Sequence, residues 1–149
     1  MKIQNLSIIS LFAAILLSFT ACSSTKNTPQ KVVSKVIEDH ETEAYNFPEG
    51  VYYTYQFEGD RPAYDFDVEA LIKQLASSEI PVKNMWYKGA SSSCTPPGSS
   101  MSMSVVVDAV LIIQTTETIE KVRELGFQRT TAPAMGQCSY RVSRYVFSK

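Results

Sequence analysis

The sequence predicts a single α+β domain over residues 48–149. In segment 51–57 every second residue is apolar or aromatic, which is the period-two pattern of a half-buried strand. Two later segments repeat apolar residues at helical spacing, and β-branched residues crowd the stretch 101–114. The resulting order of strand, helix, strand, strand, helix, strand is typical of a ferredoxin-like β-α-β-β-α-β domain. We therefore expect a four-stranded antiparallel sheet with both helices on one face and the spatial strand order 4-1-3-2.

The first helix is predicted to begin directly after Asp67. Its apolar residues recur at i, i+3, i+4 and i+7 and form one stripe, made of Val68, Leu71, Ile72 and Leu75. The Asp67 carboxylate is a favoured N-cap because it accepts hydrogen bonds from the first free backbone N–H groups. Phe66 and Leu71 stand at the two positions of a hydrophobic staple. Together these signals place the start of the helix.

The second and third strands are predicted over 80–88 and 101–114. Pro81 stands near the start of the second strand, which suits an edge strand because proline has no N–H to donate to a ladder. The third strand is rich in valine and isoleucine, which have low helix propensity. Residues 89–100 between the two strands are rich in Ser, Pro and Gly, and this composition predicts a long hairpin loop.

The second helix is predicted to have Thr116 as its N-cap and to end before Gly126. A glycine at this position adopts the left-handed conformation that terminates many helices. Phe127 then falls where an apolar residue packs back on Val122. The fourth strand is expected over 139–147, which completes the predicted domain.

The beginning of the chain has the layout of an export signal. Lys2 precedes an almost unbroken apolar run over 8–19, and small Ala21 stands directly before Cys22. A run of about 12 residues is shorter than the roughly 20 that span a bilayer, so the pattern favours a cleaved signal over a membrane anchor. The ending from Phe19 to Cys22 resembles the lipobox of bacterial lipoproteins, with Phe19 where that family usually has Leu.

This resemblance implies that residues 1–21 are a signal peptide and that the Cys22 thiol is acylated. In the lipoprotein family, residues such as Ser23 and Ser24 after the cysteine favour sorting to the outer membrane. We accordingly expect a lipid-anchored protein of the outer membrane that faces the periplasm. The competing interpretation is ordinary secretion after signal cleavage. Residues 22–47 are polar and predict a lipidated tether between the membrane and the domain.

Four apolar residues of this tether fall at helical spacing, namely Val32, Val33, Val36 and Ile37. They predict either a short amphipathic helix that docks on the domain or a mobile tether with a transient helix. His40, the single histidine of the chain, lies in the same segment. Because a histidine-based triad or metal site has no second histidine to use, we expect the His40 side chain to be solvated.

The charge balance argues against a nucleic-acid partner. The chain has 14 Lys and Arg against 15 Asp and Glu, and removal of the signal would take away only Lys2 among them. A near-neutral chain offers no positive field that could steer nucleic acid. The expected partners are the membrane, through the N-terminal lipid, and a protein, which is either another envelope protein or a second copy of this chain.

Cys94 and Cys138 are predicted to form a disulfide, because disulfides persist in exported proteins. In the expected sheet both cysteines lie at one end, where the second strand ends and the third and fourth strands begin. The loop that carries Cys94 can cross the gap of roughly 10 Å between the third and fourth strands. The bridge would pin this loop to the sheet and contribute about 4 kcal/mol to stability through loop entropy.

The same end of the sheet is compatible with an alternative, a Cu(I) site. Met101 and Met103 share one face of a strand, and Met135 stands three residues before Cys138. Soft sulfur ligands from methionine and a reduced cysteine pair select Cu(I). Methionine is also a common gap filler in apolar cores, and the chain has no C-x-x-C motif. We therefore prefer the disulfide and expect no metal or other cofactor.

A cluster of carboxylates after the first strand raises a second alternative, a small enzyme. Its members are Glu58, Asp60, Asp65 and Asp67. Carboxylates act as general acids and bases when burial shifts their pKa values. The spacing matches no EF-hand calcium loop and suits caps and turn residues around Gly59 and Pro62. We therefore expect binding and not catalysis.

The sheet face away from the helices is the predicted partner-binding surface. The third strand is apolar on both sides, whereas the side of a sheet that faces water is normally polar. We expect the apolar patch on this face to be made of Tyr52, Val106, Val110 and Ile112. A patch of this kind needs a cover, which is either the tether helix, a second copy or another envelope protein. The predicted function is that of a lipid-anchored, non-catalytic binding or assembly-accessory module.

Overall fold

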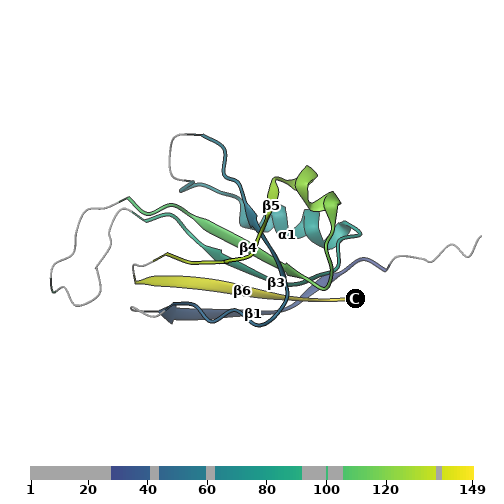
Figure 1. Ribbon diagram of the computed structural model, residues 1–149, viewed down its shortest axis with the longest axis horizontal. Helices are drawn as coiled ribbons and strands as arrows, with labels where there is room; N and C mark the ends of the chain where they lie inside the picture. The colour runs from purple at the N-terminus through teal and green to yellow at the C-terminus, as the bar shows by residue number, and fades with distance from the viewer. Residues whose placement is uncertain (1–27, 41–43, 60–62, 92–99, 101–105, 137–138) are drawn as a thin grey trace, which may run out of the picture.

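A computed structural model describes residues 28–40, 44–59, 63–91, 100, 106–136 and 139–149 of the chain. These residues form one antiparallel sheet of six strands in the order β1-β6-β3-β4-β2-β5 (Figure 1). The strands are β1 (Lys31–His40), β2 (Val51–Tyr55), β3 (Val82–Lys88), β4 (Val110–Thr115), β5 (Phe127–Thr130) and β6 (Tyr140–Ser148). The helix α1 (Val68–Ser77) and the 3-10 helix η1 (Glu120–Leu125) lie together on one face of the sheet (Figure 1).

The predicted ferredoxin-like fold is wrong, because the sheet has six strands and a different order. Two of the predicted neighbour pairs are present, since β4 pairs with both β2 and β3. The last strand, β6, lies beside β3 instead of beside β2. The edges of the sheet are formed by β1 and β5, two strands that the sequence patterns did not indicate.

The shortened second helix explains the altered strand order. A ferredoxin-like domain needs this helix to carry the chain across the sheet to the last strand. Here it is reduced to η1, which follows Ile119 and not the predicted cap Thr116, and which has no side-chain cap. Gly126 ends η1 as predicted, in the left-handed conformation with φ of 86°. Phe127 then begins β5, which pairs at once with β2 and so fills the place expected for β6.

The start of α1 is confirmed. The Asp67 side chain accepts a hydrogen bond from the backbone N–H of Ala70 at 2.9 Å, as an N-cap does. The apolar stripe of α1 is buried through Leu71, Ile72 and Leu75. The main core therefore lies between the sheet and the two helical segments. Its buried residues are Tyr53, Leu71, Ile72, Leu75, Ile80, Val82, Met85, Leu111, Ile113, Val122, Phe127, Tyr145 and Phe147.

Residues 31–40 form an edge strand, so the predicted tether helix is wrong. β1 pairs with β6 along its length, with one register shift near its start. Valine and isoleucine suit a strand as well as a helical stripe, and the available partner strand decides between them. Directly before β1, the buried side chain of Gln30 exchanges two hydrogen bonds with the backbone of Val82, at 3.0 and 3.2 Å. The sheet thus begins inside the segment that was expected to be a tether, residues 22–47.

Candidate interaction surface

A short segment covers the sheet face opposite the helices. Residues 44–50, here called the strap, lie between β1 and β2 and place the rings of Tyr45 and Phe47 on this face. The ring centroids of Tyr45 and Phe47 lie 6.1 and 5.1 Å from that of Trp86, the single tryptophan of the chain. Beneath them is a second apolar cluster, whose buried residues are Tyr52, Trp86, Ile112, Met135 and Val142. The expectation that this face needs a cover is confirmed, and the cover comes from the chain without forming a helix.

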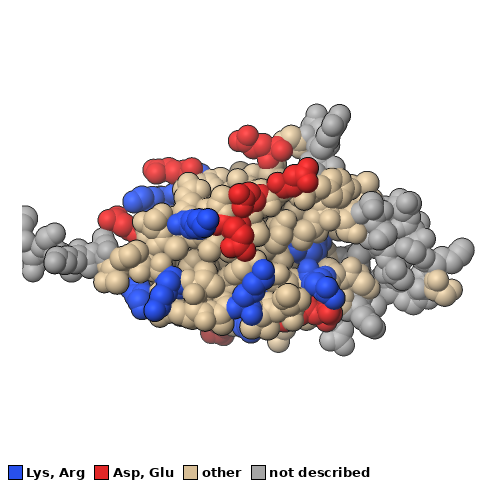
Figure 2. Space-filling view, turned by 180° about the vertical axis from the view of Figure 1, so that it is seen from behind, with Lys and Arg blue, Asp and Glu red and all other residues tan. Residues whose placement is uncertain are grey.

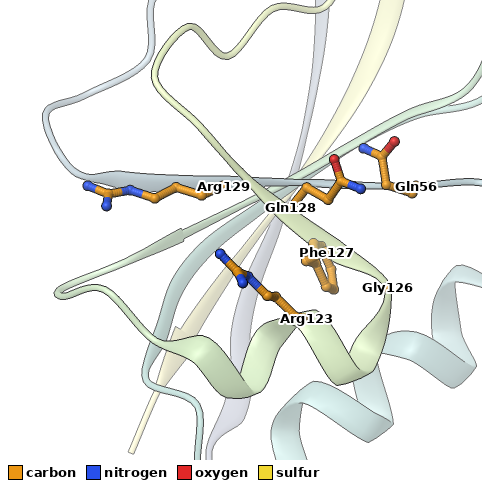
Figure 3. A pocket seen from close by; sticks show the side chains of 6 residues that line it. All are labelled: Gln56, Arg123, Gly126, Phe127, Gln128 and Arg129. Atoms are coloured by element: carbon orange, nitrogen blue, oxygen red, sulfur yellow. The ribbon is translucent and has the colours of Figure 1, made fainter.

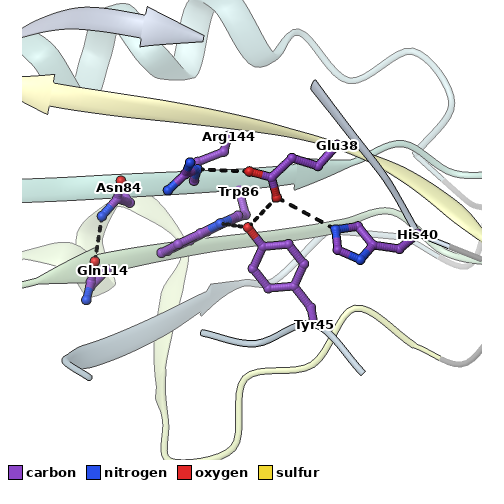
Figure 4. Close-up of polar contacts among 7 residues, drawn as sticks. All are labelled: Glu38, His40, Tyr45, Asn84, Trp86, Gln114 and Arg144. Atoms are coloured by element: carbon purple, nitrogen blue, oxygen red, sulfur yellow. Dashed lines mark hydrogen bonds and ion pairs between the residues drawn. The ribbon is translucent and has the colours of Figure 1, made fainter. Parts of the chain in front are cut away.

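A chain of polar contacts fastens the strap to the sheet (Figure 4). The Trp86 indole N–H donates to the Tyr45 hydroxyl at 2.6 Å, and this hydroxyl donates to the Glu38 carboxylate at 2.7 Å. The buried Arg144 Nε lies 3.2 Å from the other carboxylate oxygen, in an ion pair that lacks hydrogen-bond geometry. His40 Nε2 lies 3.7 Å from the first oxygen. One carboxylate therefore gathers groups from β1, β6 and the strap.

The environment of Tyr45 keeps its hydroxyl protonated. Burial, and then the hydrogen bond to Glu38, raise the pKa of Tyr45 to about 12. The hydroxyl can therefore donate to Glu38 while it accepts from Trp86 at neutral pH. The ring of His40 lies between those of Tyr140 and Tyr45, with centroid distances of 5.3 and 5.0 Å. The expectation of a solvated His40 is wrong, because this side chain is half-buried between two aromatic rings.

The far end of the strap lies tightly against β4. The Gln114 side-chain amide donates to the Glu49 carbonyl at 2.8 Å. The Gln114 side-chain oxygen accepts from the Asn84 amide at 2.7 Å, as Figure 4 shows. A Cβ added at Gly50 would lie only 2.5 Å from Gln114 Nε2. A side chain at this position would therefore displace either the strap or the buried Gln114 side chain.

The predicted partner-binding face is consequently not open. Tyr52 and Ile112 are only 7% and 1% exposed. Val110 is half-buried against the same apolar cluster, whereas Val106 is 57% exposed. The grouping of Tyr52, Val110 and Ile112 on one face is confirmed, but the strap turns these residues into core. Another surface has to be considered for binding.

A hollow lies at the free edge of β5. The strand pairs with β2 on one side, and no strand in the described part of the chain pairs with its other side. This hollow lies on the side of the helical segments and has a volume of about 470 Å³. Its lining residues are Gln56, Arg123, Gly126, Phe127, Gln128 and Arg129. Figure 3 shows Arg129 reaching out from β5 and Arg123 rising towards it from η1.

A second hollow, of about 640 Å³, also contains Arg129. It is lined by strap residues from Phe47 to Gly50 and by residues that follow β5, including Thr131 and Pro133. Because both hollows share Arg129, they form one surface along the strand edge, here called the β5 groove. An exposed strand edge presents unpaired backbone N–H and C=O groups that can pair with an added strand. The β5 groove therefore suits an extended polypeptide segment.

Charges of both signs are interspersed on the face seen in Figure 2. Acidic side chains are more frequent towards the upper part of this view and basic ones towards the lower part. This distribution agrees with the near-neutral composition of the chain.

The residues proposed for lipidation, for the disulfide and for copper are mostly beyond what the structure describes. Five of them lie outside the described residues, namely Cys22, Cys94, Met101, Met103 and Cys138. Met135 is 2% exposed and packs in the cluster under the strap. Its carbonyl accepts a hydrogen bond from Lys88 Nζ at 2.7 Å, and burial lowers the pKa of this lysine. The Met135 thioether therefore serves as an apolar core group.

The acidic cluster has the geometry of caps and turns. Asp60 lies outside the described residues, and Glu58, Asp65 and Asp67 are exposed. Asp67 caps α1, and Gly59 has a positive φ of 99°. Within the described ranges, no three His, Cys, Asp or Glu side chains are placed to hold a metal ion. None of the helices found in those ranges is long and apolar enough to cross a membrane.

Sequence patterns did not indicate the residues that define the strap and the β5 groove. Tyr45 and Phe47 alternate directly before Pro48, which is a weak sign of an extended aromatic segment. Arg129 carries no comparable sign, since a four-residue strand is too short to show a periodic pattern. No family model matches this chain, and neither a curated protein nor a solved structure is significantly similar to it. The functional argument therefore depends on the geometry.

Proposed function

We propose that this protein is a lipid-anchored, non-catalytic binding module of the bacterial envelope that holds an extended segment of a partner protein in the β5 groove. The observation that carries this proposal is the geometry of the groove. Two hollows, of about 470 and 640 Å³, lie along one free strand edge and share the Arg129 side chain. This arrangement offers backbone pairing and side-chain recognition at the same place.

The chemistry of the groove favours an acidic segment. A partner strand would add to β5 through main-chain hydrogen bonds, which provide affinity with little dependence on sequence. The Arg129 guanidinium can then bind a carboxylate of the partner through two parallel hydrogen bonds. Arg123 points to the same side, although its Nε also lies 3.2 Å from Glu120. The amides of Gln56 and Gln128 supply both donors and acceptors beside the strand edge.

The proposed anchor would hold this groove close to the outer membrane, on its periplasmic side. Gln30 is fixed to the sheet through Val82. The chain between Cys22 and Gln30 spans at most about 28 Å even when fully extended. Acyl chains contribute about 0.8 kcal/mol per buried methylene, so two or more chains give stable anchoring. The partner would therefore be another envelope protein within reach of the membrane surface.

Replacing Cys22 with serine is expected to release the protein from the membrane. The variant loses the thiol that would be acylated, while the residues of the sheet are unchanged. The measurement is the distribution of the full chain between the membrane and soluble fractions of a bacterial host. A Ser23→Ala variant is the matched control and should remain in the membrane fraction. Equal membrane retention of the Cys22→Ser chain would rule out the lipid anchor.

The groove is tested by crosslinking at β5. A photoreactive residue in place of the exposed Gln128 should capture partner segments in the producing cells, and mass spectrometry should identify them as extended and acidic. Arg129→Glu in the same chain is expected to lower the yield of the crosslinked product at least about tenfold, because it places a glutamate opposite a carboxylate of the partner segment. Lys73→Glu on α1 is the control with the same charge change. An equal loss in both variants, or no captured segment, would contradict the proposal.

A further inference from the structure

The opposite edge of the sheet carries an unusual concentration of exposed apolar residues. Three of the five large apolar side chains exposed in the described residues lie on β1, with exposed fractions of 51% for Val33, 38% for Val36 and 59% for Ile37. β1 has ten residues and pairs only with β6 in the part of the chain that the structure describes. An exposed edge strand with apolar side chains offers both unpaired backbone groups and apolar contacts to another strand.

The regular part of β1 is centred on Ile37. The register with β6 shifts between Val32 and Ser34 and is then continuous up to His40. Within this stretch, residues on alternate positions share a face of the sheet. Lys35, Ile37 and Asp39 share the face of the helical segments, because Lys35 lies opposite Tyr145 of the main core. A positive, an apolar and a negative side chain thus follow one another along the edge.

We propose that β1 pairs in antiparallel orientation with β1 of a second copy of this chain, about a two-fold axis at Ile37. The charges of the strand are self-complementary in this register. Ile37 then faces Ile37 of the second copy, and Lys35 of each copy lies opposite Asp39 of the other. On the other face, Val36 becomes a diagonal neighbour of Val36 of the second copy. The two Ile37 side chains therefore meet at the centre and the Lys35–Asp39 pairs flank them, while on the other face each Val36 lies opposite Glu38 of the second copy.

The neighbouring strand supports this arrangement of charges. Asp39 accepts hydrogen bonds from Arg141 of β6 at 2.7 and 3.3 Å. In the pair, each Asp39 would lie between Arg141 of its own chain and Lys35 of the second copy, so that the signs alternate across the strands. Lys35 already lies over the Tyr145 ring, with Nζ 5.1 Å from the centroid.

The pairing is independent of the binding function proposed above, because β1 and β5 are opposite edges of the sheet. Association through β1 would join two sheets into one and leave a β5 groove at each end. The pair would then present two equivalent grooves related by the two-fold axis. Two membrane-anchored grooves would increase the avidity for a partner that carries two copies of the recognised segment.

The first test is the mass of the purified full chain in a nonionic detergent, measured by light scattering with the detergent contribution subtracted. The unaltered chain is expected to have the mass of two copies. Ile37→Asp should have the mass of one copy, because it places two carboxylates at the axis. Val106→Asp is the matched control, since Val106 is 57% exposed, and it should remain paired. A single-copy mass for the unaltered chain, or a two-copy mass for Ile37→Asp, would overturn the proposal.

A second test uses crosslinking and does not depend on the folding of a charged variant. Opposite residues of an antiparallel pair have Cα atoms about 4.5–5.5 Å apart, within reach of a disulfide. Ile37→Cys chains should therefore form a disulfide-linked pair in membranes treated with a mild oxidant. Gln128→Cys on the β5 edge and the unaltered chain should not. Lys35→Cys should link to a co-expressed Asp39→Cys chain, and linkage through Gln128 alone would contradict the pairing.

Discussion

Replacing Cys94 or Cys138 with serine is expected to lower the free energy of unfolding by about 4 kcal/mol. A bridge between these residues closes a ring of about 45 residues and restricts the unfolded chain accordingly. The order of the strands favours this bridge more strongly than the predicted fold did. β3 and β6 are direct neighbours, and the described residues Ser91 and Ser139, close to the two cysteines in sequence, line one hollow of about 300 Å³.

The measurement is urea unfolding followed by circular dichroism. Each single variant should lose as much stability as the double variant, because either substitution removes the whole bridge. A reductant should lower the free energy of unfolding of the unaltered chain to the same level and leave that of the double variant unchanged. Mass spectrometry of the unreduced chain should show no alkylation at Cys94 or Cys138. Alkylation of both thiols, or additive losses in the double variant, would refute the disulfide.

Trp86→Ala is expected to destabilise the protein by about 3–5 kcal/mol. Trp86 is fully buried in the cluster under the strap. Its loss would leave a cavity between β3 and the strap and remove the N–H that donates to Tyr45 at 2.6 Å. The strap should then detach from the sheet, because the rings of Tyr45 and Phe47 pack against this indole. We expect limited proteolysis to cut the variant within residues 44–50.

Tyr64→Ala provides the control, since this large aromatic side chain is 53% exposed. A surface substitution of this kind should change the unfolding free energy by no more than about 0.5 kcal/mol. If Trp86→Ala does not fold, Trp86→Phe is the milder variant, since it removes the indole N–H together with only part of the ring volume. It retains most of the apolar volume and should cost about 1–3 kcal/mol, because the Tyr45 hydroxyl loses its donor. Comparable effects of the Trp86 and Tyr64 substitutions would exclude the strap as a packed cover.

Local patterns predicted the strands and the helix that have strong signals of their own. The aromatic alternation of β2 and the Asp67 cap of α1 lie within a few residues of sequence, and the structure contains both. The strand predicted over 101–114 is confirmed only for its last part, because β4 begins at Val110 and the described residues 106–109 lie outside the strand. Gly126 was also identified, because a left-handed helix end favours glycine. These elements follow from backbone and side-chain preferences that act over one or two turns.

The edge strands could not be predicted in the same way. Val32, Val33, Val36 and Ile37 satisfy helical spacing. Their extended conformation depends on β6, whose residues pair with β1 from a hundred or more positions later in the sequence. β5 has four residues, too few for a period to appear. The open binding face was wrongly expected for the same reason. Its apolar residues were correctly grouped, but the strap that covers them is recognised only through its contacts with Trp86 and Glu38.

The amino-acid sequence by itself predicts an export signal that resembles a lipobox, determines a near-neutral charge balance, and carries apolar patterns that favour strand or helix in several segments. Each of these properties depends on composition or on neighbours a few residues away. The order of the strands, the strap over Trp86 and the β5 groove are consequences of tertiary contacts. They arise because hydrogen-bonded edges and apolar faces are satisfied between distant segments, and several pairings satisfy the same local pattern equally well. The competition among those pairings is resolved only when the whole sheet assembles around its two apolar clusters.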